Sequence, residues 1–193
     1  ALLTRLFDRH GFGSKRATKK LLKKIEYLKP DIIHLHNLHG YYINIEILFN
    51  YLSFHKIPIV WTMHDCWAFT GHCSHFEFVE CRKWKEACFS CPQSSSYPSS
   101  FIVDNSKENF IKKKKLFNSL NNMTIVPVSR WLNNQLKYSY LNDFNSRVIR
   151  NGIDLEVFKP SKSGAFIKDY NLHNKFIILG VASEWTERKG FFE

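Results

Sequence analysis

The sequence predicts an α/β fold built on a doubly wound parallel sheet. Short apolar runs rich in β-branched residues recur along the chain, at 31–36 (DIIHLH), 57–63 (IPIVWTM), 123–128 (MTIVPV) and 175–183 (KFIILGVAS). Segments with the length and apolar content of helices separate these runs. Strands that alternate with helices at this spacing favour a parallel sheet covered by helices on both faces.

The first helix is expected to begin after Ser14, as its N-cap, and to end at Leu28, because Pro30 follows. Leu21, Ile25 and Leu28 fall at the spacing of one helix face. Basic residues surround this stripe: Lys15, Arg16, Lys19, Lys20, Lys23 and Lys24. The helix is therefore expected to be amphipathic and strongly basic.

The remaining elements follow from the same patterns. Helices are expected at 43–55, 106–120 and 129–141, the last with Ser129 as its cap, and a short strand at 147–150. The lysine run 112–115 is interpreted as a solvated helix face, because two apolar residues follow it at once.

The charge of the chain favours an anionic partner. Its 28 Lys and Arg residues against 17 Asp and Glu give a formal net charge of +11, which suits a nucleic acid, an anionic lipid surface or a phosphorylated substrate. No apolar run approaches the roughly 18 residues that a membrane span requires. The sequence begins with Ala1 and ends inside the run TERKGFFE, so it is expected to be a fragment cut at both ends.

Polar residues follow the predicted strands at the points where the strands end. In open parallel sheets the ligand crevice lies outside the carboxyl ends of the strands. The residues at these positions are His36, Asn37, His64, Asp65, Ser129 and Asn151. They are the first candidates for a binding or catalytic cleft.

The five cysteines form a local set between residues 66 and 91. Four of them, Cys73, Cys81, Cys88 and Cys91, are spaced C-x7-C-x6-C-x2-C, which favours a closed tetrahedral zinc site of structural type. Free thiols and two disulfides are the alternatives. Cys66 is interpreted as a small buried residue, and the odd number of cysteines favours a reducing compartment.

Several motifs together resemble one family. Asn151-Gly152 can turn the chain sharply within NGIDLEVFKP, and a second turn signal, ASEWTERKG, follows the last apolar run. With these segments, the stretch 31–190 resembles the retaining glycosyltransferases of family four, which have two Rossmann-like domains (the GT-B fold). DIIHLHNLHGYYINIEILF, HDCWAFTGHC and the later CxxCP are similar to a bacterial subgroup that makes surface polysaccharides of the colanic-acid type.

The resemblance implies a domain plan. Residues 1–172 are expected to be the later part of the acceptor-side domain, with a Cys-rich insertion at 72–100. Residues 173–193 are expected to contain the first strand and loop of the donor-binding domain. Because a GT-B site is assembled from both domains, residues 1–193 alone are expected to be inactive.

The resemblance also implies roles for single residues. His64 is expected to contact the transferred sugar near its anomeric centre, with Asp65 orienting His64 or the acceptor. The alternative for His64 is a core histidine bonded to a carbonyl group. Lys189 and Arg188 are expected to bind the donor diphosphate, whereas the loop arginine of the family is replaced by Ser183. Acceptor or cleft roles fall to Asn37, His39, Ser129, Asn151 and Gly152; His36 and His39 have a structural role as an equal alternative.

The expected function is a hexosyltransferase. It would move a sugar from a nucleotide-sugar donor to a glycan or lipid-linked acceptor with retention and without a catalytic metal, in the cytoplasm at the inner face of the bacterial plasma membrane. The alternatives are a non-enzymatic, zinc-containing nucleic-acid-binding module and a different enzyme on the same fold, such as a sugar-phosphate epimerase. Nucleic acid is the less favoured partner, since the basic residues lie on helices and not beside exposed aromatic residues.

Overall fold

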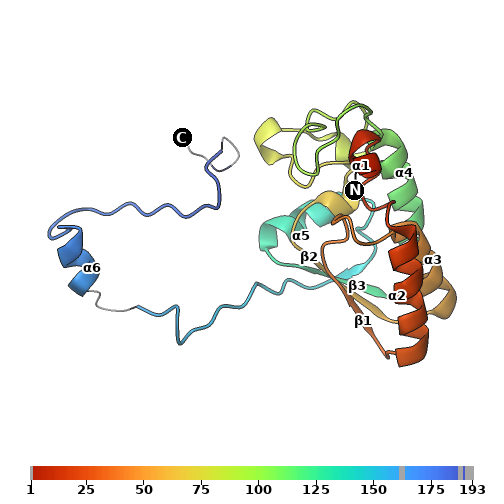
Figure 1. Cartoon of the computed structure of the whole chain (residues 1–193), viewed down its shortest axis with the longest axis horizontal. Coiled ribbons are helices and arrows are strands. Elements are labelled where there is room, and N and C mark those ends of the chain that lie inside the picture. The colour runs from red at the N-terminus through yellow and green to blue at the C-terminus, as the bar shows by residue number, and fades with distance from the viewer. Residues whose placement is uncertain (1, 161–163, 187–188, 190–193) are drawn as a thin grey trace. The chain divides into compact units, whose positions relative to one another are not determined.

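The computed structural model describes residues 2–160, 164–186 and 189 (Figure 1). The chain divides into two compact units, Ala1–Arg150 and Asn151–Glu193. The boundary predicted between residues 172 and 173 would separate the acceptor-side domain from the donor-binding domain, and it stays a prediction. No helix in the described ranges is long and apolar enough to cross a membrane.

The first unit contains a four-stranded sheet. Its strands are β1 (Ile33–Leu35), β2 (Ile59–Met63), β3 (Met123–Pro127) and β4 (Asn145–Ser146). They pair in the order β1-β2-β3-β4, and every pairing is parallel. The prediction of a parallel sheet alternating with helices is therefore confirmed. Its finer description as doubly wound stays a prediction.

The last strand begins slightly before the position expected from the sequence. β4 covers Asn145–Ser146, whereas a strand was expected at 147–150. Backbone bonds nevertheless continue the pairing with β3, from Arg147 N to Ile125 O (3.0 Å) and from Ile149 N to Pro127 O (3.2 Å). The residues expected to pair thus do so, although the regular strand is shorter.

The helices of the first unit are α1 (Leu2–Leu6), α2 (Lys15–Leu28), α3 (Ile45–His55), α4 (Ser106–Phe117) and α5 (Arg130–Leu136). Figure 1 shows α2, α3 and α4 beside one another, in agreement with the contacts of α3 with both neighbours. Ser129 caps α5 as predicted, because its side chain accepts from Leu132 N. The prediction for Ser14 is wrong: its residue has a left-handed backbone, and its hydroxyl donates to Tyr41 O instead.

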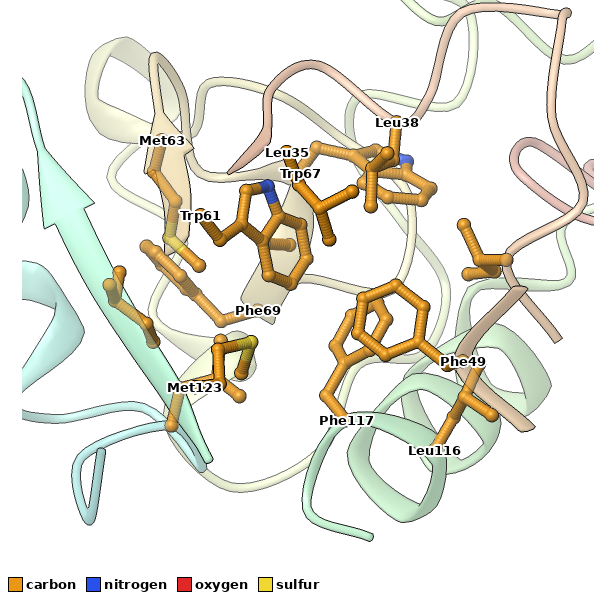
Figure 2. Packing of buried hydrophobic residues seen from close by; sticks show 14 of the residues in the cluster. Leu35, Leu38, Phe49, Trp61, Met63, Trp67, Phe69, Leu116, Phe117 and Met123 are labelled. Atoms are coloured by element: carbon orange, nitrogen blue, oxygen red, sulfur yellow. The ribbon is translucent and has the colours of Figure 1, made fainter. Parts of the chain in front are cut away.

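The buried core joins the sheet to the helices and to the segment after β2. Figure 2 shows Trp61 of β2 close to Phe49 of α3 and Phe117 of α4. The rings of Phe49 and Phe117 lie 4.6 Å apart, and those of Trp61 and Phe117 lie 4.9 Å apart. Each such ring buries enough apolar surface to contribute about 2–3 kcal/mol to folding. This packing holds β2 in place up to the residue before His64.

The Cys-rich insertion is a packed part of this unit. It contains two short 3-10 helices, η2 (Glu77–Val79) and η3 (Lys83–Lys85), and a third, η1 (Trp67–Phe69), lies just before it. Phe76 and Trp84 are buried and stacked at 4.8 Å. At Gly71 a Cβ atom would lie 2.1 Å from Ser106 O, so only glycine allows the loop to pack this closely against the start of α4.

Lys113 corrects the interpretation of the lysine run 112–115 as solvated surface. Lys112, Lys114 and Lys115 are exposed as expected, but Lys113 is fully buried. Its Nζ donates to Trp67 O at 2.6 Å and lies 3.8 Å from the centre of the Trp67 ring. The sequence pattern failed here because a lysine at the inward-facing position of α4 finds a carbonyl acceptor and an aromatic ring from a distant segment.

The second unit contains the helix α6 (Gly164–Asp169) and otherwise irregular backbone among its described residues. The strand expected at 175–183 is absent there, contrary to the prediction. Phe176, Ile178 and Leu179 are between 82% and 92% exposed. A strand requires a hydrogen-bonded partner, and no partner strand lies beside these described residues. The segment NGIDLEVFKP is irregular, as expected.

Candidate active site

Two histidines meet at the carboxyl edge of the sheet. His36 follows β1 and His64 follows β2, so the parallel pairing of these strands brings them together. His36 Nδ1 and His64 Nε2 are hydrogen-bonded at 3.1 Å, and the rings stack with centres 5.4 Å apart. Both side chains are exposed. His64 is therefore not a core histidine, and the alternative interpretation from the sequence is wrong.

The environment of His36 favours its neutral form. Partial desolvation lowers the pKa of His36, and the neighbouring rings of His34 and His64 lower it further by repulsion between like charges. A hydrogen bond between two imidazoles requires one ring nitrogen to accept, so at least one ring must be neutral. The other ring nitrogens, His36 Nε2 and His64 Nδ1, are not used in this bond and can bind a ligand.

Asp65 forms a second pair, with His39. His39 Nε2 donates to Asp65 Oδ2 at 2.8 Å, and Trp67 N donates to Asp65 Oδ1 at 2.9 Å. Burial opposes ionisation of Asp65, but these two hydrogen bonds and the charge of His39 outweigh it and lower the pKa of Asp65. The expectation that Asp65 orients His64 is not met, since its side chain is bound to His39. Tyr97 Oη is hydrogen-bonded to His39 Nδ1 at 3.3 Å.

The two pairs line one shallow hollow. Its lining includes His36, Asn37, His39, His64 and Asp65, all of which lie at the carboxyl ends of β1 and β2. A surface of this kind can accept and donate hydrogen bonds to sugar hydroxyls, and its carboxylate can stabilise positive charge near it.

The other predicted site residues lie elsewhere. Ser129 follows β3, but its hydroxyl is used to cap α5. Asn151, Gly152, Ser183 and Lys189 belong to the second unit and are exposed there. Arg188 lies outside the described residues. The structure thus brings together the predicted residues of the first two strands, and the donor-side predictions stay untested.

The four predicted zinc ligands surround one small pocket. Cys73, Cys81, Cys88 and Cys91 all line it, together with Trp84. Gly71 N donates to Cys88 Sγ at 3.1 Å. A hydrogen bond from the Cys73 thiol lowers the pKa of Cys91 to about 7, whereas burial raises the pKa of Cys88 to about 11. All five cysteines are free thiols in the structure, and Cys66 is buried as expected.

A further group was missed by reasoning from the sequence. Asp8, His10 and His72 are buried together, and their ligand atoms all lie within 4.8 Å of one another. This group can hold a metal ion. Among the described residues, no other group of three or more histidine, cysteine or acidic side chains has its ligand atoms this close together. The sulfur atoms of the four cysteines lie farther apart. No sequence signal joins the DRHG segment to His72, because more than sixty residues separate them.

The fold and the edge site define a class of protein that the comparisons identify. The family model of Glycosyltransferase Family 4 matches residues 2–157, so the chain belongs to glycosyltransferase family 4. It is similar to the putative colanic acid biosynthesis glycosyl transferase WcaC of Escherichia coli (strain K12), with 29% identity over 165 residues. That match covers 79% of this chain and 38% of WcaC. No solved structure matches the chain.

Proposed function

We propose that the intact protein transfers a sugar from a nucleotide-sugar donor to a glycan or lipid-linked acceptor, with retention, in surface-polysaccharide synthesis. The observation that carries this proposal is the placing of the His36–His64 and His39–Asp65 pairs at the carboxyl edge of a parallel sheet, in a chain of glycosyltransferase family 4. The similarity to a colanic acid glycosyl transferase supports the polysaccharide context. Family membership favours this enzyme over the nucleic-acid-binding alternative.

The chemistry fits the side chains at this edge. In a retaining transfer the bond from the anomeric carbon to the leaving diphosphate breaks, and the acceptor oxygen bonds to the same face of the sugar. The acceptor proton passes to the departing phosphate. Positive charge develops on the sugar ring between these events, so the enzyme must stabilise charge and hold geometry. An exposed imidazole at His64 can bond a sugar hydroxyl or face the charged centre.

The finer fold assignment belongs to the same proposal. The four-stranded sheet would be part of a doubly wound acceptor-side domain, and residues 173–193 would begin the donor-binding domain. Lys189, Arg188 and Ser183 would then face the donor diphosphate, where a lysine ammonium neutralises phosphate charge. Asn151 and Gly152 would take part in acceptor binding.

A transfer assay with product analysis tests the function. The intact protein is incubated with a panel of uridine- and guanosine-diphosphate sugars and a lipid-linked acceptor. We expect transfer from one donor, and NMR of the product should show the anomeric configuration of that donor. An inverted product, or no transfer from any nucleotide sugar to any glycan acceptor, would contradict the proposal.

We also propose a structural zinc ion bound by Cys73, Cys81, Cys88 and Cys91. They surround one pocket, and the bond from Gly71 N to Cys88 Sγ is of the kind that supports a thiolate ligand. The sulfur atoms would have to move closer together on binding. We expect Cys88→Ser with Cys91→Ser to lose one equivalent of zinc in elemental analysis, while Cys66→Ser, a control outside the pocket, loses none. Equal zinc in all three proteins would refute this site.

A third proposal concerns an anionic membrane surface as a partner of α2. Its six basic residues are all exposed, and so are Leu21, Tyr27 and Leu28. Only part of the predicted apolar stripe is shielded from solvent. Thr18 is buried, and Leu22 and Ile25 are half-buried. The exposed side chains of Leu21 and Leu28 can contact lipid. Each basic residue near an anionic surface contributes about 1 kcal/mol to membrane binding.

Vesicle sedimentation tests this surface. We expect the intact protein to bind vesicles that contain phosphatidylglycerol, and the binding to weaken with salt and with Lys19→Glu, Lys23→Glu. The control with the same change of charge is Lys107→Glu, Lys137→Glu, at exposed positions outside α2. If both double variants lose binding equally, general charge and not α2 is responsible, and the proposal fails.

A further inference from the structure

The buried group of Asp8, His10 and His72 joins segments that are distant in the sequence. Asp8 and His10 follow α1, and His72 lies in the turn after η1. The three residues are 0%, 2% and 1% exposed. Asp8 Oδ1 lies 2.5 Å from His72 Nδ1 and 3.9 Å from His10 Nε2. The two imidazole rings meet edge to face, with centres 5.6 Å apart.

The hydrogen bonds of the group leave three ring nitrogens unused. His72 Nδ1 donates to Asp8 Oδ1, but His72 Nε2 and both nitrogens of His10 have no hydrogen-bond partner. Burial lowers the pKa of His10 to about 4, and the Ser99 backbone lies near the ring without hydrogen-bond geometry. Buried polar atoms in folded proteins are almost always paired. Three unpaired nitrogens beside one carboxylate therefore point to a bound group.

Hydrogen bonds fix the orientation of the Asp8 carboxylate, as they do for carboxylate ligands of metal sites in other proteins. Asp8 Oδ2 accepts from Asn105 N at 2.9 Å, and Asp8 O accepts from Asn109 Nδ2 at 2.6 Å. These bonds fix both the side chain and the backbone of Asp8 against the start of α4. Oriented ligands with outer hydrogen bonds of this kind are typical of metal sites. The neighbouring amine, Lys113 Nζ, is directed at Trp67 O and the Trp67 ring.

We propose that Asp8, His10 and His72 bind a divalent transition-metal ion of the zinc class as a structural ligand set. Two imidazole nitrogens and one carboxylate oxygen are ligands that zinc prefers, and a water molecule can complete a tetrahedral set. The ring nitrogens that ligate the metal must be unprotonated, so metal uptake competes with proton binding. The ion fastens the N-terminal segment and the start of α4 to the turn that begins the Cys-rich insertion. Burial of all three ligands excludes substrate, so the site is structural.

This site is independent of the proposed cysteine site, and the test separates them. We expect elemental analysis of the purified chain to show that His10→Gln loses one equivalent of zinc, whereas His55→Gln, at an exposed histidine on α3, loses none. The loss should also occur in the background of Cys88→Ser, Cys91→Ser. Cobalt(II) bound in that background should show visible ligand-field bands without thiolate-to-metal charge transfer.

A second measurement applies if His10→Gln fails to fold. A chelator should then lower the Tm of the Cys88→Ser, Cys91→Ser protein by several degrees, and zinc should restore it. The proposal is overturned if this background holds no zinc or cobalt, if the chelator leaves its Tm unchanged, or if Asp8→Asn and His10→Gln retain full metal content. The first two results would assign the unpaired nitrogens to a buried water, and the third would place the metal ion at other residues. Loss of the cysteine-bound zinc alone leaves this site unaffected.

Discussion

Replacing His64 with alanine in the intact enzyme is expected to lower its turnover by roughly 10²-fold or more, the size typical of losing one preorganised electrostatic contact. The side chain is exposed and hydrogen-bonded to His36 at 3.1 Å, so its removal should leave the fold intact. Lys189→Ala should differ: it should weaken donor binding as well as turnover, because a lysine on the diphosphate acts in the ground state too.

The measurement is steady-state kinetics with circular dichroism as the check of folding. His55→Ala, at an exposed histidine of α3 that does not line the hollow, is the matched control and should keep full activity. His36→Ala should reduce turnover less than His64→Ala, since His36 positions its neighbour. Unchanged turnover in His64→Ala, or an unfolded protein, would remove His64 from the site.

The stability of the protein should rise with pH above about 7 because of Lys113. Burial lowers the pKa of Lys113 from 10.5 to about 7. Between these values the unfolded chain binds the proton and the folded chain does not, so the free energy of unfolding rises by about 1.4 kcal/mol per pH unit. Below pH 7 both states are protonated, and the full cost of burying the ammonium group is present.

Urea unfolding followed by tryptophan fluorescence between pH 7 and 9.5 tests this dependence. Lys113→Met should remove the rise, while Lys112→Met, at the exposed neighbouring position, should keep it. The difference between the wild type and each variant cancels the titration of the cysteines. Parallel curves for the wild type and Lys113→Met would show that the buried amine keeps its proton at neutral pH.

The candidate site was partly predictable for a simple geometric reason. In a parallel sheet, polar residues that follow neighbouring strands must lie at one edge, so His36 and His64 could be placed together from their positions alone. The hydrogen-bond partner of Asp65 could not be predicted in this way. The residue turned toward Asp65 is His39, three residues beyond His36, and which of several nearby histidines it meets depends on the path of the loop.

Local patterns in the sequence were sufficient for β1, β2, β3 and the helices α2 to α5, because apolar periodicity and caps act over a few residues. Only the tertiary structure decided which polar groups are buried. Lys113 and Asp8 look like surface residues in the sequence, yet each is buried beside groups from distant segments. The run at 175–183 shows the converse, since its apolar residues form no strand without a partner. Burial and strand pairing are properties of contacts between segments, and no local pattern records them.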